Sequence, residues 1–328
     1  MNDCRFGPVI EDDGVLFRLW APLCDTVHLQ VGSGSPQPME RKDEGWFHLK
    51  VTDVGAGATY QFHLPQGLIV PDPASRHQPD DVSGPSEVID LSRHAMRDPI
   101  WRGKPWEDMV LYELHVGSFT EEGTFQALIE RLDHLVELGI TAIQLMPIAD
   151  FPGRWNWGYD GVLPYAADSR YGRPEDLILL VEAAHQRGLS VLLDVVYNHF
   201  GPAGNFMAAY APLFTPHHQT PWGDGINFDA AKSALVRVFL IENALYWIKE
   251  FHIDGLRLDA VHAIRDDSDT HFLEELAVRI RADFSDRNVH LVVENEENDA
   301  ELMKRGPASR AILYEAQWND DLHHALHV

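Results

Sequence analysis

From residue 109 onward, short apolar runs alternate with stretches of helical spacing. The strand-like runs cover residues 110–116, 142–146, 190–196, 255–259 and 290–294, with a sixth near 311–314. The helical patterns between them cover residues 124–138, 174–187, 232–251 and 270–284. This alternation predicts βα units and a parallel sheet. Gly139 and Gly188 each follow a helical pattern, where glycine commonly ends a helix and turns the chain toward the next strand.

The first hundred residues follow a different pattern. Strand-like runs at 15–22, 27–31, 46–51 and 59–64 are separated by clusters of Gly, Pro and Asp. This spacing predicts a small antiparallel, immunoglobulin-like sandwich. Recurrent prolines then interrupt any regular element. We therefore predict a β-sandwich over residues 1–90, a linker over 91–108 and a βα domain over 109–328.

Two connections between the predicted elements are unusually long. Residues 149–173 and 197–231 both follow strand-like runs. In a (β/α)8, or TIM-type, barrel the loops at the carboxyl ends of the strands build the active site. Only about six strands can be counted, so we predict an incomplete (β/α)8 barrel. Its unpaired edges are expected to make the isolated chain aggregate.

The charge of the chain limits its partners. Its 26 Lys and Arg against 51 Asp and Glu give a formal charge of -25, which opposes binding to nucleic acid or to an anionic membrane surface. No apolar run approaches the roughly 18–20 residues of a membrane helix, and no signal-peptide pattern opens the chain. We expect a cytoplasmic protein. Neither a nucleotide-binding glycine loop nor an EF-hand occurs, so no cofactor is predicted. The oligomeric state stays open.

Two of the predicted strands end on a carboxylate, Asp259 and Glu294. Two carboxyls at neighbouring strand ends are the minimum equipment for cleaving a glycosidic bond. Arg257 lies on the same strand face as Asp259 and favours its ionised form, as a nucleophile requires. The apolar residues before Glu294 favour a retained proton, as an acid requires. A buried structural ion pair between Arg257 and Asp259 explains the first pattern equally well.

Further polar residues follow another strand-like run. Asp194 lies on the same face as Asn198 but deeper, where it can reach Arg257, and His199 lies nearer the rim. After the last strand-like run, an aromatic residue again precedes polar ones, among them Asn319, Asp320 and His323. His323 and His327 are four residues apart, as metal ligands on a helix can be. No third ligand is evident, so no metal is predicted.

The loop 151–161 combines glycines with Trp155, Trp157, Tyr159 and Asp160. Aromatic faces stack on sugar rings, and a carboxylate can hold sugar hydroxyls, so this combination suits carbohydrate binding. For Trp155, anchoring of the loop is an equally good interpretation.

Three of these regions together resemble the α-amylase superfamily of retaining glycoside hydrolases and transglycosylases. They are residues 194–199, residues 255–262 and the strand that ends on Glu294. The resemblance covers about residues 109–328, and the amino-terminal sandwich resembles the carbohydrate-binding-like module that precedes the barrel in branching and debranching enzymes. Within the superfamily, further segments are similar to enzymes that release trehalose from maltooligosyltrehalose. These segments are residues 112–117, 156–162, 256–262, 294–296 and 317–324.

The resemblance implies hydrolysis of the α-1,4 bond between trehalose and a maltooligosaccharide, with maltooligosyltrehalose or a related α-glucan as the bound partner. Asp259 would be the nucleophile, and Glu294 would protonate the leaving trehalose and then activate water. The implied substrate-binding residues are Trp157, Tyr159, Asp160, Asp194, His199, Arg257, His262, Asn319, Asp320 and His323. The superfamily's third carboxylate follows the seventh strand, beyond Val328, so the chain alone is expected to be poorly active.

Two other functions remain open. A glucan branching enzyme has the same fold but passes the intermediate to a sugar hydroxyl instead of water. A non-catalytic carbohydrate-binding protein would need only the sandwich and the aromatic loop. Retaining enzymes place their two carboxyls about 5–5.5 Å apart and inverting enzymes about 6.5–9.5 Å apart, and the resemblance implies the shorter separation.

Overall fold

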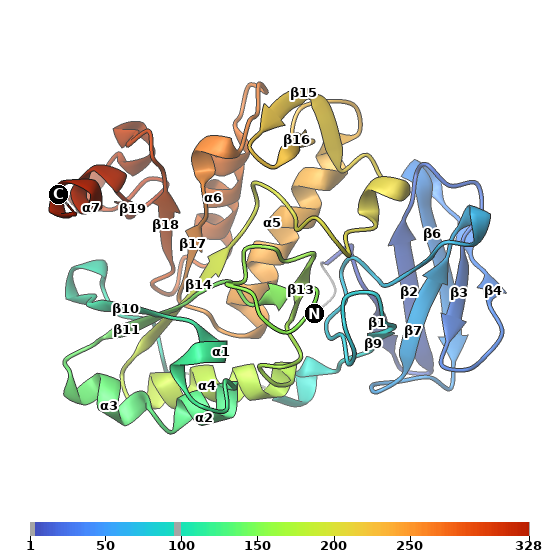
Figure 1. The fold of residues 1–328 in the computed structure, drawn as a ribbon, viewed down its shortest axis with the longest axis horizontal. Helices are drawn as coiled ribbons and strands as arrows, with labels where there is room; N and C mark the ends of the chain where they lie inside the picture. The colour runs from blue at the N-terminus through green and yellow to red at the C-terminus, as the bar shows by residue number, and fades with distance from the viewer. Residues whose placement is uncertain (1–3, 95–99, 328) are drawn as a thin grey trace. The chain divides into compact units, whose positions relative to one another are not determined.

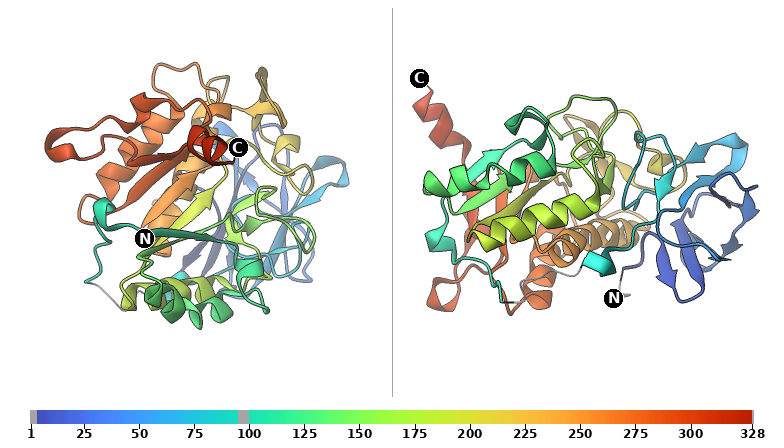
Figure 2. Two further views of the ribbon diagram at one scale, coloured as in Figure 1. Left: turned by 60° about the vertical axis from the view of Figure 1, so that its left-hand side comes forward. Right: turned by 90° about the horizontal axis from the view of Figure 1, so that it is seen from below.

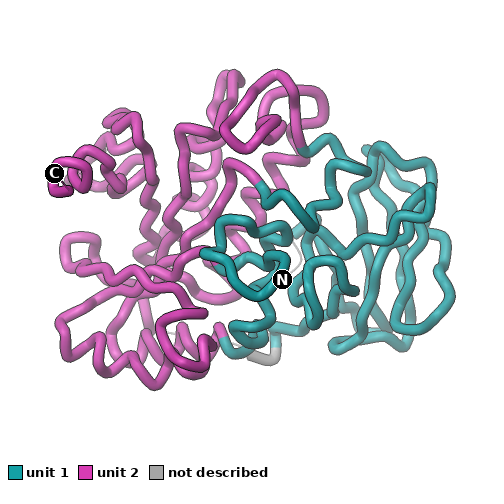
Figure 3. The backbone as a smooth tube through the Cα atoms, in the orientation of Figure 1, with its two compact units in different colours: residues 1–95, 148–176, 200–213 teal, residues 96–147, 177–199, 214–328 magenta. Residues whose placement is uncertain are grey.

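The computed structural model describes residues 4–94 and 100–327, which group into two compact units (Figure 3). The first unit takes its residues from 1–95, 148–176 and 200–213, and the second from 96–147, 177–199 and 214–328. The domain boundaries at residues 90 and 109 stay predictions. Residues 95–99 of the predicted linker lie outside the described part. No helix within the described ranges has the length and hydrophobicity needed to span a bilayer.

Two antiparallel sheets form the amino-terminal part of the first unit (Figure 1). One has the order β1 (Val9–Glu11), β2 (Gly14–Trp20), β6 (Trp46–Thr52), β5 (Glu40–Arg41). The other has the order β4 (Gln37–Pro38), β3 (His28–Val31), β7 (Thr59–His63), β8 (Ile69–Val70), and β9 (Ser86–Glu87) also pairs with β7. The ring of Phe17 in the first sheet lies 4.8 Å from that of Tyr60 in the second, and both are buried. The predicted antiparallel sheets are confirmed.

Short turns of 3-10 helix connect many of these strands and those that follow. They are η1 (Asp43–Gly45), η2 (Pro65–Gly67), η3 (Leu91–His94), η4 (Trp106–Asp108), η5 (Met207–Ala209), η6 (Val261–Ala263), η7 (Ala300–Met303) and η8 (Pro307–Ser309).

The stretch predicted as a loop at 149–173 contains two antiparallel strands of the first unit, β12 (Ala149–Asp150) and β13 (Leu163–Ala167). All five residues of β13 are buried, and Leu163 and Ala166 form an apolar cluster with Val82 and Val162. This segment therefore shares an apolar cluster with Val82 of the first unit, which its glycines and aromatic residues did not indicate.

Asp150 on β12 is a buried carboxyl in this segment. It is 1% exposed, and within the described residues its Oδ2 has no hydrogen-bond partner. Burial, and next the negative charge of Asp168, raise the pKa of Asp150 to about 9. Asp168 is held by Arg170, whose Nε donates to Oδ1 at 2.8 Å. Asp150 is therefore protonated in the folded protein at neutral pH.

Asp150→Asn is expected to raise the free energy of unfolding at pH 7 by about 1–3 kcal/mol. The folded pKa lies above the unfolded value of 3.8, so the stability that Asp150 contributes is complete below about pH 4 and is lost as pH rises toward 9. The amide of Asn is neutral at every pH, so the variant does not lose stability as pH rises through this range. Urea unfolding at pH 5, 7 and 8.5 measures the free energy of unfolding of both proteins, with the exposed Asp12→Asn as control. An unchanged slope of stability against pH would contradict the prediction.

A six-stranded parallel sheet organises the second unit. Its order is β10 (Leu111–Leu114), β11 (Ala142–Leu145), β14 (Ser190–Val195), β17 (Gly255–Leu258), β18 (His290–Glu294), β19 (Ala316–Trp318). Every neighbouring pair is parallel. Within the described ranges β10 and β19 are the two outer strands of this sheet. Six parallel strands with their helices make part of a (β/α)8 barrel, as predicted, and aggregation through the outer strands stays a prediction.

Two strand predictions were wrong in detail. The sixth strand begins at Ala316, after the predicted range 311–314. The last residue of that range, Tyr314, is buried, and its hydroxyl donates to the carbonyl of Leu273. The first strand ends at Leu114, and a short helix, α1 (Val116–Phe119), follows it. An antiparallel hairpin of β15 (Phe214–Thr220) and β16 (Gly223–Ile226) occupies part of the long connection predicted at 197–231.

The longer helices follow the predicted helical patterns. They are α2 (Phe125–Ile129), α3 (Leu132–Glu137), α4 (Pro174–Gln186), α5 (Ser233–Glu250) and α6 (Phe272–Asp283). A further helix, α7 (Asp320–Leu326), lies outside the predicted helical patterns. Helices α5 and α6 lie side by side (Figures 1 and 2). The pattern at 124–138 is divided in two because the Arg131 N–H donates to the carbonyl of Leu128, which tightens the turn. Gly139 and Gly188 have φ of 84° and 74°, which confirms them as helix ends.

Candidate active site

The carboxyl ends of three neighbouring strands bring the main candidate residues together. In the sheet register Asp194 of β14 lies opposite Arg257 of β17, and Arg257 lies opposite Val292 of β18. Asp259 directly follows β17, and Glu294 ends β18. Because parallel strands point the same way, these side chains meet at one edge of the sheet, where the active sites of barrel enzymes lie.

A single guanidinium, that of Arg257, lies among three carboxylates. Its Nη1 donates to both oxygens of Asp194, at 3.1 and 3.0 Å, and to Oδ1 of Asp259 at 2.6 Å. Its Nη2 lies 3.7 Å from Oε2 of Glu294. The side chain of Asp194 is fully buried, and the other three are largely buried. The expectations that Arg257 and Asp259 share a face and that Asp194 reaches Arg257 are confirmed.

The backbone after β17 holds one oxygen of Glu294. Ala260 has a left-handed φ of 42°, a conformation that costs free energy for an alanine and tends to occur at functional sites. In this conformation the Ala260 N–H donates to Oε2 of Glu294 at 2.7 Å. The carbonyl of Ala260 accepts from Nδ2 of Asn198 at 3.4 Å. With Oε2 fixed in this way, Oε1 is the atom of Glu294 suited to carry a proton.

Asn198 and His199 extend the cluster from the end of β14. Nδ2 of Asn198 donates to Oδ2 of Asp259 at 3.2 Å, and Oδ1 of Asn198 lies 2.8 Å from Nδ1 of His199. The imidazole of His199 stacks on Trp222, with ring centroids 4.4 Å apart and 6° between the planes. Trp222 lies in the turn between β15 and β16 and is 49% exposed. A half-exposed ring at this place suits stacking on a sugar.

Trp222 is the residue that the sequence interpretation missed. The signal available was a large aromatic side chain in the short turn Thr220–Gly223, between two largely polar strands. An apolar ring has no packing reason to stand in such a turn, so it could have been added to the aromatic residues already selected.

His262 and the residues near the carboxyl end lie in the same unit. Nε2 of His262, on η6, lies 3.6 Å from Oε1 of Glu296. Asn319 is the N-cap of α7: its Oδ1 accepts from the Leu322 N–H at 3.0 Å, and its Nδ2 donates to Asn298. These contacts give Asn319 a structural role, and a substrate contact stays a prediction.

The structure changes the choice of ligands considered for a metal near the carboxyl end. His323 was paired in the sequence with His327, but the ligand atoms that converge within 4.8 Å are those of Asp320, His323 and His324. The group lies on the short helix α7, and both histidines are exposed. We assign no metal to it.

The aromatic loop belongs to the first unit. Trp155 and Trp157 are 77% and 75% exposed. Nδ2 of Asn156 donates to Asp160 at 2.7 Å, and Oδ1 of Asn156 accepts from the Gly158 N–H at 2.8 Å, so the loop is braced by its own polar residues. Both rings are therefore largely exposed, although the guanidinium of Arg154 lies over the Trp155 ring, 5.0 Å from its centroid. Sugar binding by Trp157, Tyr159 and Asp160 stays a prediction.

The family model "Alpha amylase, catalytic domain" matches residues 83–212. The chain is 46% identical over 323 residues to the malto-oligosyltrehalose trehalohydrolase of Saccharolobus solfataricus. The aligned region covers 98% of this chain and 56% of that protein. The chain is 36% identical over 275 residues to the 1,4-alpha-glucan branching enzyme GlgB of Vibrio parahaemolyticus. Here the aligned region covers 76% of this chain and 36% of that protein.

A solved structure agrees with these sequence similarities. The crystal structure of a putative alpha amylase from Salmonella typhimurium superposes with a TM-score of 0.95 at 47% identity, over 99% of this chain and 55% of that one. The chain spans about half the length of the curated trehalohydrolases that it matches. From these matches and the parallel sheet, the chain is homologous over nearly its whole length to malto-oligosyltrehalose trehalohydrolases, and its residues 83–212 match the catalytic domain of the alpha-amylase family.

Proposed function

We propose that the chain belongs to a retaining glycoside hydrolase that cleaves the α-1,4 bond between trehalose and a maltooligosaccharide. The observation that carries this proposal is the cluster in which Arg257 binds Asp259 at 2.6 Å and lies 3.7 Å from Glu294. Glycoside hydrolases cleave such a bond with a pair of carboxyl groups, and Asp259 and Glu294 lie at neighbouring strand ends. The similarity to malto-oligosyltrehalose trehalohydrolases supports the choice of maltooligosyltrehalose as substrate over other α-glucans.

In the proposed first step, Asp259 attacks the anomeric carbon of the terminal glucose of the maltooligosaccharide. The bond from that carbon to the trehalose oxygen breaks, and Glu294 donates a proton to this oxygen. Arg257 and Asn198 hold one oxygen each of Asp259, which fixes the carboxylate for attack. Oε1 of Glu294 delivers the proton because the Ala260 N–H holds Oε2.

In the second step Glu294 takes a proton from water, and the water oxygen attacks the anomeric carbon and displaces Asp259. Two inversions leave the released maltooligosaccharide in its original α configuration. Retaining enzymes of this kind hold their two carboxyl groups about 5–5.5 Å apart, closer than inverting enzymes do.

Charge in the cluster favours such a reaction. Three carboxylates face one guanidinium, so the site has an excess of negative charge when all three are ionised. The sugar develops positive charge as the glycosidic bond breaks, and fixed negative groups stabilise that charge most where water is excluded.

The remaining residues are proposed to bind the sugars. His199, which stacks on Trp222, and Arg257 would hold the sugar at the cleavage point. Trp157, Tyr159 and Asp160 would bind sugar units of the substrate, Tyr159 by stacking. His262, Asn319, Asp320 and His323 would contact the leaving trehalose. A neutral sugar is compatible with the formal charge of -25.

A branching enzyme is the second candidate, because the chain is also similar to GlgB. It would use the same covalent intermediate and differ only in the acceptor, a sugar hydroxyl in place of water. The products therefore distinguish the two functions.

The test is product analysis with maltotriosyltrehalose, using the purified chain beside the full-length Saccharolobus solfataricus relative as positive control. We expect slow release of trehalose and maltotriose. Proton NMR during the reaction should show the α anomer of maltotriose first. Asp259→Asn should release neither product.

Other outcomes would decide against the proposal. New α-1,6 linkages formed on a linear glucan, without trehalose, would favour the branching enzyme. No product from a folded chain, together with glucan binding that Asp259→Ala leaves unchanged, would favour a carbohydrate-binding protein. The β anomer of maltotriose as first product would exclude retention.

A further inference from the structure

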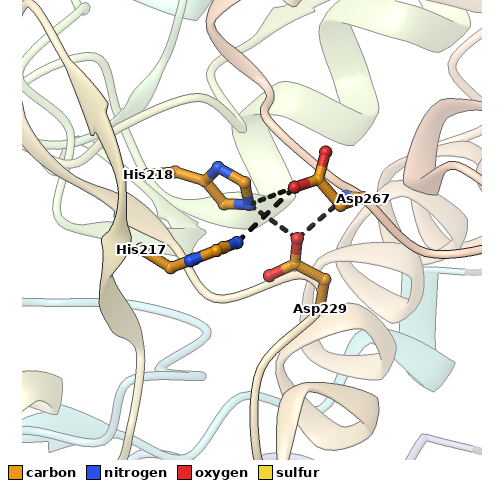
Figure 4. A group of neighbouring side chains, drawn as sticks. All are labelled: His217, His218, Asp229 and Asp267. Atoms are coloured by element: carbon orange, nitrogen blue, oxygen red, sulfur yellow. Dashed lines mark hydrogen bonds and ion pairs between the residues drawn. The ribbon is translucent and has the colours of Figure 1, made fainter.

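Three segments of the second unit meet at a group of two imidazoles and two carboxylates (Figure 4). His217 and His218 come from β15, Asp229 from the connection between β16 and α5, and Asp267 from the loop after η6. One ligand atom from each residue lies within 4.8 Å of the others. None of the four residues takes part in the proposed reaction.

The separations between these atoms are close to those of a metal site. Nε2 of His217 lies 3.5 Å from Oδ2 of Asp267, and Nε2 of His218 lies 4.0 Å from the same oxygen. Four ligands at about 2.0–2.2 Å around a tetrahedral Zn²⁺ stand roughly 3.3–3.6 Å from each other. Nε2 of His218 and Oδ2 of Asp229 are nearer, at 2.6 Å, because a proton lies between them. A metal ion would replace that proton and widen this pair.

Asp229 gives a second, independent indication of a bound cation. Its side chain is only 8% exposed, and its Oδ1 is buried without a hydrogen-bond partner among the described residues. Its Oδ2 already accepts from His218 and, at 2.8 Å, from the Asp267 N–H. A buried carboxylate oxygen without a partner costs free energy, and a metal ion would supply the missing interaction.

The simpler interpretation is two ordinary contacts that fasten the hairpin, one largely buried and one exposed. His218 and Asp229 would then form a hydrogen-bonded pair, and His217 and Asp267 a weak exposed one, since their side chains are 65% and 75% exposed. This interpretation leaves the missing hydrogen bond of Oδ1 of Asp229 unexplained and gives no reason for four potential metal ligands to converge.

We propose that His217, His218, Asp229 and Asp267 bind one divalent transition-metal ion, with Zn²⁺ as the best match. Two imidazoles and two carboxylates suit Zn²⁺ and neighbouring metals such as Co²⁺, whereas Ca²⁺ and Mg²⁺ prefer oxygen ligands. Two of the four ligands are open to solvent, so an ion can enter without unfolding the site.

The metal would join the hairpin to the loop that follows Asp259 and His262. The Asp267 N–H already donates to Asp229, and the neighbouring Asp266 binds Arg237 at 2.6 Å, so that loop is firmly held. The hairpin carries Trp222 at its turn. A bound ion would therefore fix β15 and the segment that follows β16 to a firmly held loop of the second unit.

The experiment is isothermal titration of the metal-free chain, with any affinity tag removed, using zinc chloride. We expect one zinc per chain and a higher unfolding temperature with zinc, since an ion that binds the folded state stabilises it. Cobalt(II) in place of zinc should give the visible absorption of a tetrahedral complex. His217→Ala and Asp267→Asn alter exposed side chains and should each weaken zinc binding more than about tenfold.

His324→Ala is the matched control, because it removes a histidine from the group on α7. It should bind zinc like the unchanged chain. No binding at millimolar zinc would overturn the proposal. Binding that both His217→Ala and Asp267→Asn leave unchanged would overturn it as well, and loss of binding in His324→Ala alone would place the zinc on α7 instead.

Discussion

Arg257→Met is expected to lower the free energy of unfolding by about 3–5 kcal/mol. The substitution keeps much of the apolar volume and removes the charge. Asp194, which is fully buried, then loses both of its bonds to Nη1, and Asp259 loses its bond of 2.6 Å. Removing one partner of a buried ion pair leaves an uncompensated charge, which costs far more than the net contribution of the intact pair.

Urea unfolding followed by circular dichroism measures this loss. Arg279→Met is the matched control, because Arg279 pairs with Asp283 on the exposed surface of α6, and that change should cost less than about 1 kcal/mol. Adding Asp194→Asn to Arg257→Met should recover part of the stability, since one buried charge is removed. Equal stability of Arg257→Met and Arg279→Met would show that the carboxylates do not depend on the guanidinium.

Asp254→Ala is likewise expected to lower the free energy of unfolding, by about 3–5 kcal/mol. Asp254 lies at the opposite end of β17 from Asp259. The Asp254 carboxylate is fully buried, has three hydrogen-bond partners and lies 3.9 Å from Nη2 of Arg287. Trp101 Nε1 donates to Oδ1 at 2.8 Å, while Oδ2 lies 2.8 Å from Nε2 of His185 and accepts from the Val191 N–H at 2.9 Å. In Asp254→Ala, Trp101, His185 and the Val191 N–H lose the carboxylate as their partner. Each buried polar group without a partner costs about 1–3 kcal/mol.

The comparison for this change is Asp133→Ala, which removes a carboxylate whose side chain is 72% exposed and pairs with Arg187. It should change the free energy of unfolding by less than about 1 kcal/mol. The Trp101 ring stacks on His185 at 4.5 Å, so near-ultraviolet circular dichroism should also change in Asp254→Ala. An unaltered near-ultraviolet spectrum with full stability would contradict the assigned network.

Local periodicity predicted the centre of the candidate site well. The two-residue repeat of a strand placed Arg257 and Asp259 on one face, and the parallel arrangement placed Asp194 beside them. Both inferences need only the order of residues within a strand and the direction of its neighbours. The same reasoning found five of the six parallel strands at nearly their observed positions.

Features that depend on contacts between distant residues could not be predicted in this way. Trp222 meets His199 only because the β15–β16 hairpin folds toward the end of β14. His218 meets Asp229 and Asp267 across separate segments, so no spacing in the sequence marks the group. The left-handed backbone at Ala260 also gives no signal, because alanine is a residue that ordinarily avoids it.

The three carboxylates around Arg257 have a practical consequence for the choice of buffers and inhibitors. A small ammonium ion that carries hydroxyl groups can both pair with the excess negative charge and hydrogen-bond to the carboxylate oxygens, as the proposed sugar substrate would. Hydroxylated amine buffers are therefore expected to compete with substrate, whereas phosphate is repelled. Polyhydroxylated cyclic amines are accordingly the compounds from which to develop ligands for this site.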